Sequence, residues 1–354
     1  MKKFTSISLF SGAGGLDVGF ESAGFETVFA NEFDHDAAEA WRINRPTRSH
    51  IMVEGDFHKY IDELERFSDI DVLFGGPPCQ GFSVAGKMDP DDERSKLVWL
   101  FMGAVEKVNP KIFIMENVAA LGLLEKWKDV RENIVKKGKN LNYDVSFQVH
   151  CTSDYGVPEN RDRVIFIGVR KDVGSVETFY AKLMEHREIP QTAREVILSA
   201  GEYGADENPQ TCTANVTLAI HPVMRKSPYA GMLVNGAGRP INLDSVAPTL
   251  PASMGGNKTP IVDEIALHDE NIPNWFEIYH AGLVSGEMSP LTSEVPTTVR
   301  RLTIKECAAI QTFPVGYKFS GRKTKQYKQI GNAVPCRFAE AVAASIRDAY
   351  LGGR

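Results

Sequence analysis

The first third of the chain alternates two hydrophobic patterns. Short apolar runs predict strands over residues 5–10, 26–33, 71–74, 112–117 and 163–169. Apolar residues at helical spacing predict helices between them, over residues 15–25, 34–44, 95–108 and 124–138. Strands that alternate with helices form a mostly parallel sheet, because each parallel connection crosses over the sheet. We therefore predict an α/β domain whose mostly parallel sheet carries helices on both faces.

The pattern changes in the second half of the chain. Residues 200–300 are rich in Gly, Pro, Asn, Ser and Thr, and their closely spaced turns predict short strands and loops. Helical spacing returns over 303–313 and in a closing segment over 336–351. This change predicts a second, smaller domain that is rich in loops and strands.

Composition indicates a soluble globular protein. The 354 residues are 43% hydrophobic and 24% charged, and no window approaches the roughly 18 apolar residues of a membrane span. The first residues lack the uninterrupted apolar run of a signal peptide. Five cysteines are scattered without a CxxC pair, which argues against a zinc site or a disulfide framework. We expect a cytoplasmic protein with no membrane partner and no metal.

The net charge of −6 is distributed unevenly. Residues 1–93 hold 8 basic and 18 acidic side chains, whereas the remainder holds 32 and 28. Residues 300–337 hold nine Lys or Arg against a single acid, Glu306. Such a segment is either a phosphate-binding face or a solvated, lysine-rich surface.

The stretch GGPPCQGFSVAGK, residues 75–87, holds a cysteine on a constrained loop. Proline fixes φ and glycine permits sharp turns, neither of which a buried core cysteine needs. The loop follows the strand predicted over 71–74, and open α/β sheets place their sites at the carboxyl ends of strands. Cys79 is therefore a candidate reactive thiol, with a structural cysteine as the alternative.

A glycine loop containing Gly12 and Gly14 follows the first predicted strand. The dinucleotide fingerprint requires a small residue three positions beyond Gly14, where this chain has Asp17, so pyrophosphate binding is disfavoured. Glu32 ends the second strand, where a carboxylate usually binds ribose hydroxyls, and Asp56 could accept an adenine amino group. A nucleoside cofactor without a pyrophosphate fits S-adenosyl-L-methionine, although a purely structural turn explains the glycines equally well.

A carboxylate and two arginines complete the candidate chemistry. Glu116 ends an apolar strand on the same predicted rim as Cys79, and burial there would raise its pKa enough to donate a proton near neutrality. Arg161 and Arg163 stand at alternate positions, so in an extended segment they point the same way. They could grip a polar ligand edge or hold the glutamate, or they are ordinary surface arginines.

Eight motifs, in order, carry a resemblance to a known family. They read FSGAGGLDVGFESAGF, NEFD, GDF, GGPPCQGFS, ENV, ENRDRV, RRLTIKECAAIQTFP and QIGNAVP. Together they resemble the cytosine-C5 DNA methyltransferases of bacterial restriction–modification systems, and they span nearly the whole chain apart from a long stretch over about residues 185–298. That family keeps its variable target-recognition region there. The resemblance implies a Rossmann-like, S-adenosylmethionine-dependent methyltransferase fold.

The resemblance also implies a reaction and roles for residues. Cys79 would attack C6 of a cytosine as the thiolate, and the resulting enamine would take a methyl group at C5. Glu116 would hold or supply the proton at N3, and Arg163 would lie at O2 with Arg161 bracing the site. The cytosine would be flipped out of duplex DNA. The long polar loop 83–95 beside Cys79 is a candidate lid that closes after DNA binds, with an ordinary connecting loop as the alternative.

By the same resemblance, S-adenosyl-L-methionine is the cofactor and S-adenosyl-L-homocysteine the product. The residues expected to line its pocket are Phe10, Gly12, Gly14, Leu16, Glu32, Phe33, Asp56, Phe57, Pro78, Asn332 and Ala333. Since the last two are distant in sequence, the C-terminal helix should return to the first domain. We expect a catalytic and cofactor-binding domain over 1–185, completed by 326–354, and a target-recognition domain over 186–325.

The expected substrate is double-stranded DNA. Arg and Lys read guanine and phosphate, and Asn reads adenine. On residue type, the candidate DNA contacts are Ser83, Lys87, Arg225, Lys226, Arg239, Asn257 and Lys258. We expect a monomer, since one chain supplies both cofactor and recognition halves. A cognate restriction endonuclease would act on the same sequence without binding stably.

One residue departs from the family pattern, and other functions stay open. The family usually has glutamine before the arginine pair, where this chain has Glu159. If that residue touches the DNA backbone or the active-site loop, a carboxylate adds repulsion or requires a compensating cation. An RNA cytosine-C5 methyltransferase of the same fold and an inactive DNA-binding relative are the alternatives. A hydride-transferring enzyme is disfavoured by Asp17 and gives no reason for the PPCQG loop.

Overall fold

The computed structural model describes residues 4–78 and 96–352. They divide into two compact units, each described by itself. The first unit comprises Met1–Gly156, Arg161–Ile189 and Ala333–Arg354, and the second comprises Val157–Asn160 and Pro190–Asn332. Cys79, Ser83, Lys87 and the proposed lid over 83–95 lie outside the described residues.

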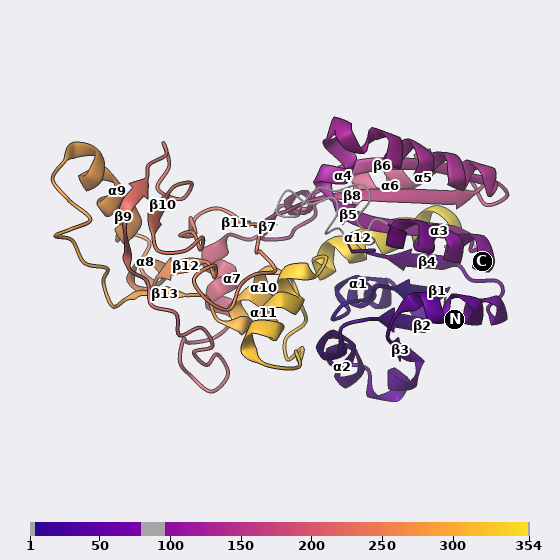
Figure 1. Cartoon of the computed structure of the whole chain (residues 1–354), viewed down its shortest axis with the longest axis horizontal. Coiled ribbons are helices and arrows are strands. Elements are labelled where there is room, and N and C mark those ends of the chain that lie inside the picture. Colours follow the sequence, from indigo (N-terminus) through magenta and orange to yellow (C-terminus); the bar gives the residue numbers. More distant parts are fainter. Residues whose placement is uncertain (1–3, 79–95, 353–354) are drawn as a thin grey trace. The chain divides into compact units, whose positions relative to one another are not determined.

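The first unit is built on a seven-stranded sheet in the order β3-β2-β1-β4-β5-β8-β6 (Figure 1). Its strands are β1 (Phe4–Leu9), β2 (Phe25–Glu32), β3 (Met52–Glu54), β4 (Val72–Gly75), β5 (Ile112–Val118), β6 (Tyr143–Cys151) and β8 (Asp162–Arg170). The neighbours from β3 through β5 pair in parallel, whereas β8 runs antiparallel to β5 and β6. The prediction of a mostly parallel α/β sheet is confirmed, although hydrophobic pattern alone gave neither β6 nor the reversed direction of β8.

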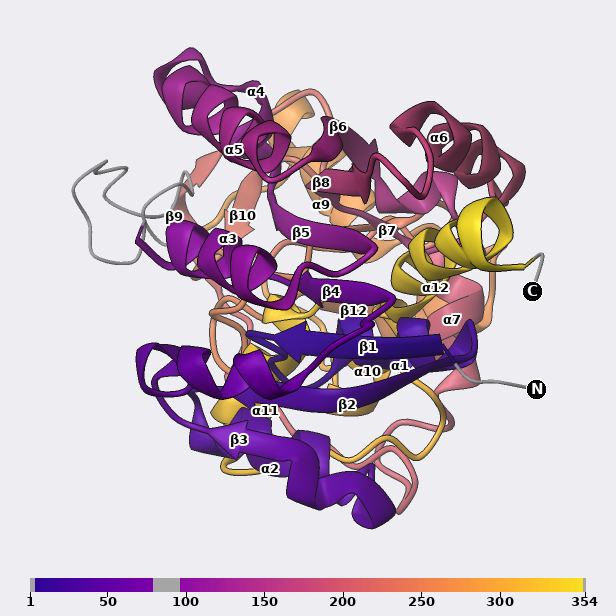
Figure 2. The ribbon, with the colours of Figure 1, turned by 90° about the vertical axis from the view of Figure 1, so that its right-hand side faces the viewer.

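Helices cover this sheet in two layers (Figure 2). The α-helices of the unit are α1 (Gly15–Ser22), α2 (His35–Ile43), α3 (Lys96–Val108), α4 (Ala119–Leu123), α5 (Lys128–Asn140), α6 (Val176–Glu185) and α12 (Cys336–Ile346). Short 3-10 turns are η1 (Pro46–Ile51), η2 (Phe57–Lys59), η3 (Ile61–Arg66), η5 (Glu125–Trp127) and η6 (Thr152–Asp154), and a π-turn, η7 (Arg347–Leu351), ends the last helix. Helices α1, α6 and α12 pack together in one layer, and α3 packs on α5 in the other.

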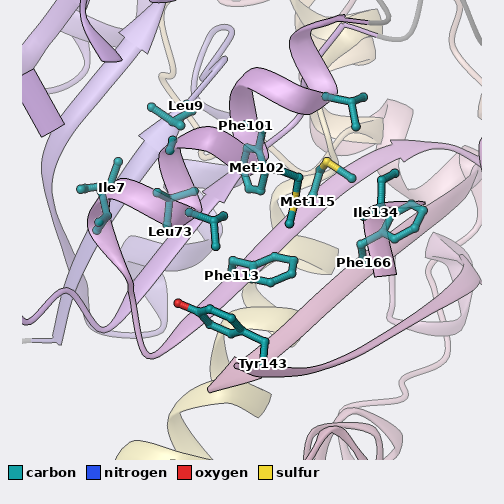
Figure 3. Packing of buried hydrophobic residues seen from close by; sticks show 14 of the residues in the cluster. Ile7, Leu9, Leu73, Phe101, Met102, Phe113, Met115, Ile134, Tyr143 and Phe166 are labelled. Atoms are coloured by element: carbon teal, nitrogen blue, oxygen red, sulfur yellow. The ribbon is translucent and has the colours of Figure 1, made fainter. Parts of the chain in front are cut away.

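The main core lies between the sheet and the layer of α3 and α5. Figure 3 shows Phe113 and Met115 of β5 among Phe101 of α3, Ile134 of α5 and Tyr143 of β6. All five side chains are fully buried, and burial of apolar surface stabilises a fold by about 25 cal/mol per Å². The core therefore holds β4 and β5 rigidly, and the loops that leave their carboxyl ends start from fixed points.

In the other helix layer, the C-terminal helix α12 packs against α1, the helix that follows the glycine loop. A Cβ added to Gly19 of α1 would lie 2.4 Å from the Cβ of Ala339 in α12, so only glycine permits this approach. A Cβ on Gly15 would likewise lie 2.4 Å from the carbonyl oxygen of Val334. The chain thus returns from distant sequence to pack on the first βα turn.

The second unit contains short strands and five α-helices among the described residues (Figure 1). Its strands are β7 (Glu159–Asn160), β9 (Leu218–Val223), β10 (Met232–Val234), β11 (Ala247–Pro248), β12 (Ile261–Asp263) and β13 (Val299–Arg301). Its helices are α7 (Ala193–Ser199), α8 (Glu264–His268), α9 (Trp275–Ser285), α10 (Ile304–Ile310) and α11 (Lys323–Asn332). The strands pair only in twos, and a small core of Leu233, Ile261, Phe276 and Tyr279 holds them against α9, a helix that the turn-rich composition did not predict.

No helix among the described residues is long and apolar enough to cross a membrane.

One buried carboxyl in the first unit makes stability depend on pH. Asp17 is fully buried and accepts a hydrogen bond of 2.9 Å from Nε1 of Trp41, and burial raises the pKa of Asp17 to about 6 against the attraction of Arg45. Because the folded pKa lies above the ordinary value of 3.8, the folded chain binds the extra proton, and stability falls as pH rises through 6. At pH 7 the ionised group costs roughly 3 kcal/mol.

We expect Asp17→Asn to stabilise the protein by about 1–3 kcal/mol at pH 7, with the difference vanishing near pH 4. The asparagine oxygen can keep the Trp41 hydrogen bond, and the nearby Ser8 hydroxyl can accept from its amide. Urea unfolding of both proteins between pH 4 and pH 8 measures the effect. A variant less stable than the parent at pH 7 would show that the carboxylate is needed as a charge.

Candidate active site

The predicted site residues of the first unit gather at one edge of the sheet. The carboxyl ends of β1 to β5 meet there because these strands are parallel. Strand β8 starts at the same edge because it is antiparallel, and its Arg163 pairs with Val118 at the end of β5. Glu116, near the end of β5, and Arg163, near the start of β8, therefore meet at this edge. The sequence could not show this, because it does not give the direction of β8.

Glu116 is buried and ion-paired. Its residue is 9% exposed, and Nε of Arg163 lies 2.7 Å from its Oε1. A Cβ added to Gly76 would lie 2.9 Å from Oε2, so the backbone of the loop after β4 passes directly against the carboxylate. Nδ2 of Asn117 donates to the carbonyl oxygen of Pro77 at 3.1 Å and ties this loop to β5. The chain that leads into Cys79 is therefore anchored on the strand that carries Glu116.

The electrostatics of Glu116 suit a group that exchanges a proton. Burial raises the pKa of Glu116, while the charges of Arg163 and Arg161 oppose that rise. The pKa is raised overall, so the carboxyl holds a proton more readily than an exposed glutamate does, and the two guanidinium charges limit that rise.

Arg161 is 1% exposed and lies just before β8, outside any strand. Its carbonyl oxygen accepts a 3.0 Å hydrogen bond from the amide of Thr152, which fixes the backbone at the turn into β8. Nη1 of Arg163 donates to the carbonyl oxygen of Asp162 at 2.7 Å. Neither arginine is an ordinary surface residue, since both are largely buried and act on Glu116.

The glycine loop and the end of β2 form a second group on the same edge. Glu32 accepts hydrogen bonds from the amides of Gly12 at 2.7 Å and Asp34 at 2.8 Å. Burial raises the pKa of Glu32, and these amides oppose the rise. Phe33 follows with 74% of its surface exposed, which is unusual for a large apolar side chain. Phe10 has a positive φ of 55° and packs edge-on against Phe57 at 5.8 Å between ring centroids.

Asp56 is placed by a residue that sequence reasoning missed. Nδ2 of Asn31, buried at the end of β2, donates to the carbonyl oxygens of Val53 at 2.9 Å and Gly55 at 3.1 Å. These bonds hold the turn after β3, where Asp56 accepts from the backbone and ring nitrogens of His58. The sequence contained a sign of this role, because Asn31 in NEFD ends an apolar strand. A buried asparagine there has to find hydrogen-bond partners for its amide inside the protein.

The donor set at this edge fits S-adenosyl-L-methionine. The Glu32 carboxylate, already oriented by two amides, has lone pairs left for ribose hydroxyls, and the exposed Phe33 ring offers a face to adenine. Leu16 and Ala333 lie in the first unit, where α1 packs on α12, and Gly14 caps α1 with a φ of 90°. Pro78 is the last described residue of its loop. Asn332 ends α11 in the second unit.

In the second unit the structure brings together three of the five candidate DNA contacts. Arg239, Asn257 and Lys258 are exposed on adjacent segments, since Ile261 donates its amide to the carbonyl oxygen of Arg239. Arg225 and Lys226 lie elsewhere, after β9, where His280 of α9 hydrogen-bonds the carbonyl oxygen of Arg225 at 2.7 Å.

Two arginines of the basic segment 300–337 are buried and bind groups inside the second unit. Arg301 is 3% exposed and donates to the carbonyl oxygens of Ala214 at 3.0 Å and Thr259 at 2.8 Å, and also to that of Asn257. Arg300 is held between the carboxylates of Glu264 and Glu306. Neither guanidinium is exposed to solvent. A phosphate-binding face in the segment 300–337 would therefore have to use the later basic residues of that segment.

Glu159 is an internal residue of the second unit. It is fully buried in β7, and its Oε1 accepts the amide of Leu250 at 2.5 Å. Beside it, β7 pairs in parallel with β11, and Thr249 donates its hydroxyl to the carbonyl oxygen of Asn160 at 2.6 Å. The carboxylate therefore holds the chain segment that precedes Asn257 rather than facing solvent.

We expect Glu159→Gln to retain stability, because the amide oxygen of glutamine can accept the same Leu250 N–H. Glu159→Leu should destabilise the protein by about 1–3 kcal/mol, since it leaves a buried amide without its acceptor. Urea unfolding midpoints of the two variants compare these outcomes directly. A leucine variant as stable as the parent would show that water or another group replaces the carboxylate.

Comparison with known proteins agrees with this geometry. A family model for the C-5 cytosine-specific DNA methylases matches residues 4–348. The type II methyltransferase M.NgoPII of Neisseria gonorrhoeae is 31% identical over 357 residues, covering 96% of this chain and 94% of that protein. M.FnuDI of Fusobacterium nucleatum, also a type II methyltransferase, is 30% identical and covers 97% and 94%.

Solved structures share the fold at lower identity. A mutant of DNMT2 from Spodoptera frugiperda superposes with a TM-score of 0.67 at 18% identity, covering 97% of this chain and 99% of that one. The S. pombe Dnmt2 methyltransferase gives a TM-score of 0.62 at 14% identity, with coverages of 98% and 99%. Since the family model spans nearly the whole chain and relatives of 30–31% identity cover almost all of it, this protein belongs to the C-5 cytosine-specific DNA methylase family.

Proposed function

We propose that this enzyme methylates C5 of a cytosine within a short specific sequence of duplex DNA, with Cys79 as the nucleophile. The observation that carries the proposal is the buried ion pair between Glu116 and Arg163, 2.7 Å apart. It lies directly against the loop that leads from β4 to Cys79. A carboxyl and a guanidinium side by side match the N3 and O2 edge of a cytosine.

The chemistry requires a covalent step because cytosine C5 is a poor nucleophile. The Cys79 thiolate adds to C6, and a proton held by Glu116 at N3 prevents negative charge from building up on the ring. This addition consumes the C5–C6 double bond and leaves an enamine between C4 and C5, so C5 becomes nucleophilic and can accept a methyl group. Removal of the C5 proton by a base and departure of the thiolate restore the aromatic ring. Arg163 fixes O2, and the charges of Arg163 and Arg161 oppose the rise in the pKa of Glu116 that burial causes.

S-adenosyl-L-methionine, when bound, supplies an electrophilic methyl group and leaves as S-adenosyl-L-homocysteine. Glu32 would hold its ribose hydroxyls, Phe33 its adenine ring and Asp56 the adenine amino group. Phe10, Phe57, Leu16, Pro78, Asn332, Ala333 and the glycines of the loop would complete the pocket. The target cytosine has to leave the base stack to reach this edge, and the loop 83–95, with Ser83 and Lys87, would close over it.

The second unit would read the DNA sequence. Exposed Arg239, Asn257 and Lys258 supply base or phosphate contacts from adjacent segments, and Arg225 and Lys226 supply others. Relatives named type II methyltransferases support a role in protecting DNA from a restriction endonuclease that recognises the same sequence without binding this chain. One chain holds both units, so we propose a monomer.

The test uses the purified protein, labelled S-adenosyl-L-methionine and two substrates, mixed-sequence duplex DNA and mixed RNA. We expect label in DNA alone, and bisulfite sequencing should place every protected cytosine in one short shared sequence. Label in RNA alone would favour an RNA cytosine methyltransferase. DNA binding without any transfer would favour an inactive relative.

A further inference from the structure

The basic segment of the second unit has an exposed part that the proposed site does not use. Arg322, Lys323 and Lys325 stand at the start of α11, and all three are exposed. Nζ of Lys323 donates to the carbonyl oxygen of Gln210 at 3.3 Å. Three cations within four residues make a concentrated positive surface.

This surface lies beside the loop that carries two candidate DNA contacts. A Cβ added to Gly255 would be 2.9 Å from Cα of Thr324, so the loop packs directly on the first turn of α11. Gly255 has a φ of 102°, a conformation that glycine adopts without strain, and the chain continues to Asn257 and Lys258, both exposed. Lys258 thus follows, by three positions, a residue that contacts the first turn of α11.

Acidic residues are sparse in the two stretches of sequence that carry these cations. Between Asn208 and Val262 the sequence contains one acid, Asp244, against Arg225, Lys226, Arg239 and Lys258. No acid occurs from residue 307 to residue 339. The cations of these two stretches outnumber their acids, with Asp206 and Glu207 shortly before Gln210 as the nearest acids in sequence, and this excess gives a local positive potential on a protein that carries −6.

We infer that Arg322, Lys323 and Lys325, together with Lys258, form a surface that binds the phosphate backbone of the duplex beside the recognised sequence. The inference rests on the proposed function, since the ligand is the DNA that the enzyme methylates. Phosphate contacts position a protein on DNA and carry no sequence information. The surface therefore adds affinity and register, while the exposed loops of the second unit provide specificity.

The test compares a triple variant with a matched control. The variant is Arg322→Ala, Lys323→Ala and Lys325→Ala, and the control removes three exposed lysines of the first unit, Lys136, Lys139 and Lys171. Fluorescence anisotropy with a mixed-sequence duplex is measured over a range of NaCl concentrations. Thermal melting checks that both variants fold.

Each phosphate contact contributes about 0.9 to the slope of log affinity against log salt. We expect the triple variant to lose about 2–3 from that slope, to bind at least about tenfold more weakly near 0.1 M salt, and to methylate the same sequence as the parent. An unchanged slope, or an equal loss in the control, overturns the inference. If the parent transfers no methyl group to DNA, the proposed function fails. If the parent is active but the salt slope of the triple variant is unchanged, only the inference about this surface fails.

Discussion

Replacing Cys79 by serine is expected to abolish methyl transfer while leaving the binding of duplex DNA and of S-adenosyl-L-methionine intact. A serine hydroxyl ionises far less readily than a thiol, so the variant has almost no anion to add to C6. Removing a nucleophile that acts with its partners as a unit costs more than about 10⁴-fold in rate. Single-turnover transfer of labelled methyl groups to DNA measures the loss.

Cys151→Ser is the matched control for this exchange. Cys151 ends β6, and its sulfur lies 3.1 Å from the Ser153 hydroxyl, so serine replaces it with little change in contacts. We expect this variant to transfer methyl groups at the parental rate. Transfer by Cys79→Ser at a rate similar to the control would show that the reaction needs no thiolate.

The second large effect is expected at Glu116. Glutamine has nearly the same shape and can still accept from Arg163, but it cannot give up a proton to cytosine N3. General acid catalysis by a positioned group contributes about 10²–10⁴-fold, so Glu116→Gln should slow single-turnover transfer by that factor without weakening DNA binding. Glu125→Gln is the control, since the Glu125 side chain is 86% exposed on η5.

The pH dependence of transfer adds an independent readout for Glu116. Burial raises the pKa of this carboxyl, and only its protonated form donates. The parental rate should therefore fall as pH rises through that pKa, and the glutamine variant should lack this decline. A variant that keeps the parental pH profile would place the proton donor elsewhere.

Much of the first unit could be predicted because its signals are local. The strands read as short apolar runs, and each expected helix has its apolar residues at helical spacing. Glu32 and Glu116 could be placed on one rim because the carboxyl ends of parallel strands meet at one edge. That inference needs only strand order along the chain, not the positions of side chains.

What the sequence could not provide depends on contacts between distant segments. The antiparallel direction of β8, which brings Arg163 to Glu116, is set by pairing with β5 and leaves no trace in the hydrophobic pattern. Gly76 looks like any loop glycine until the Glu116 carboxylate is seen 2.9 Å from its missing Cβ.

The second unit was predicted least well, for a related reason. Helix α9 lies in turn-rich sequence, and its Phe276 and Tyr279 are buried only because the β9–β10 hairpin and β12 pack around them. Glu159 departs from the family pattern at a position that suggested contact with DNA. Its carboxylate instead holds Leu250 inside the unit, so the departure concerns folding of that segment.

The most direct test of the covalent mechanism uses duplex DNA in which 5-fluorocytosine replaces cytosine. Fluorine cannot leave C5 as the proton does, so the reaction should stop after methyl transfer with the enzyme still attached. We predict a protein–DNA adduct that survives denaturing electrophoresis, requires S-adenosyl-L-methionine, is absent in Cys79→Ser and maps to the peptide containing Cys79. If the enzyme methylates ordinary duplex DNA but forms no such adduct, covalent attack on C6 is contradicted.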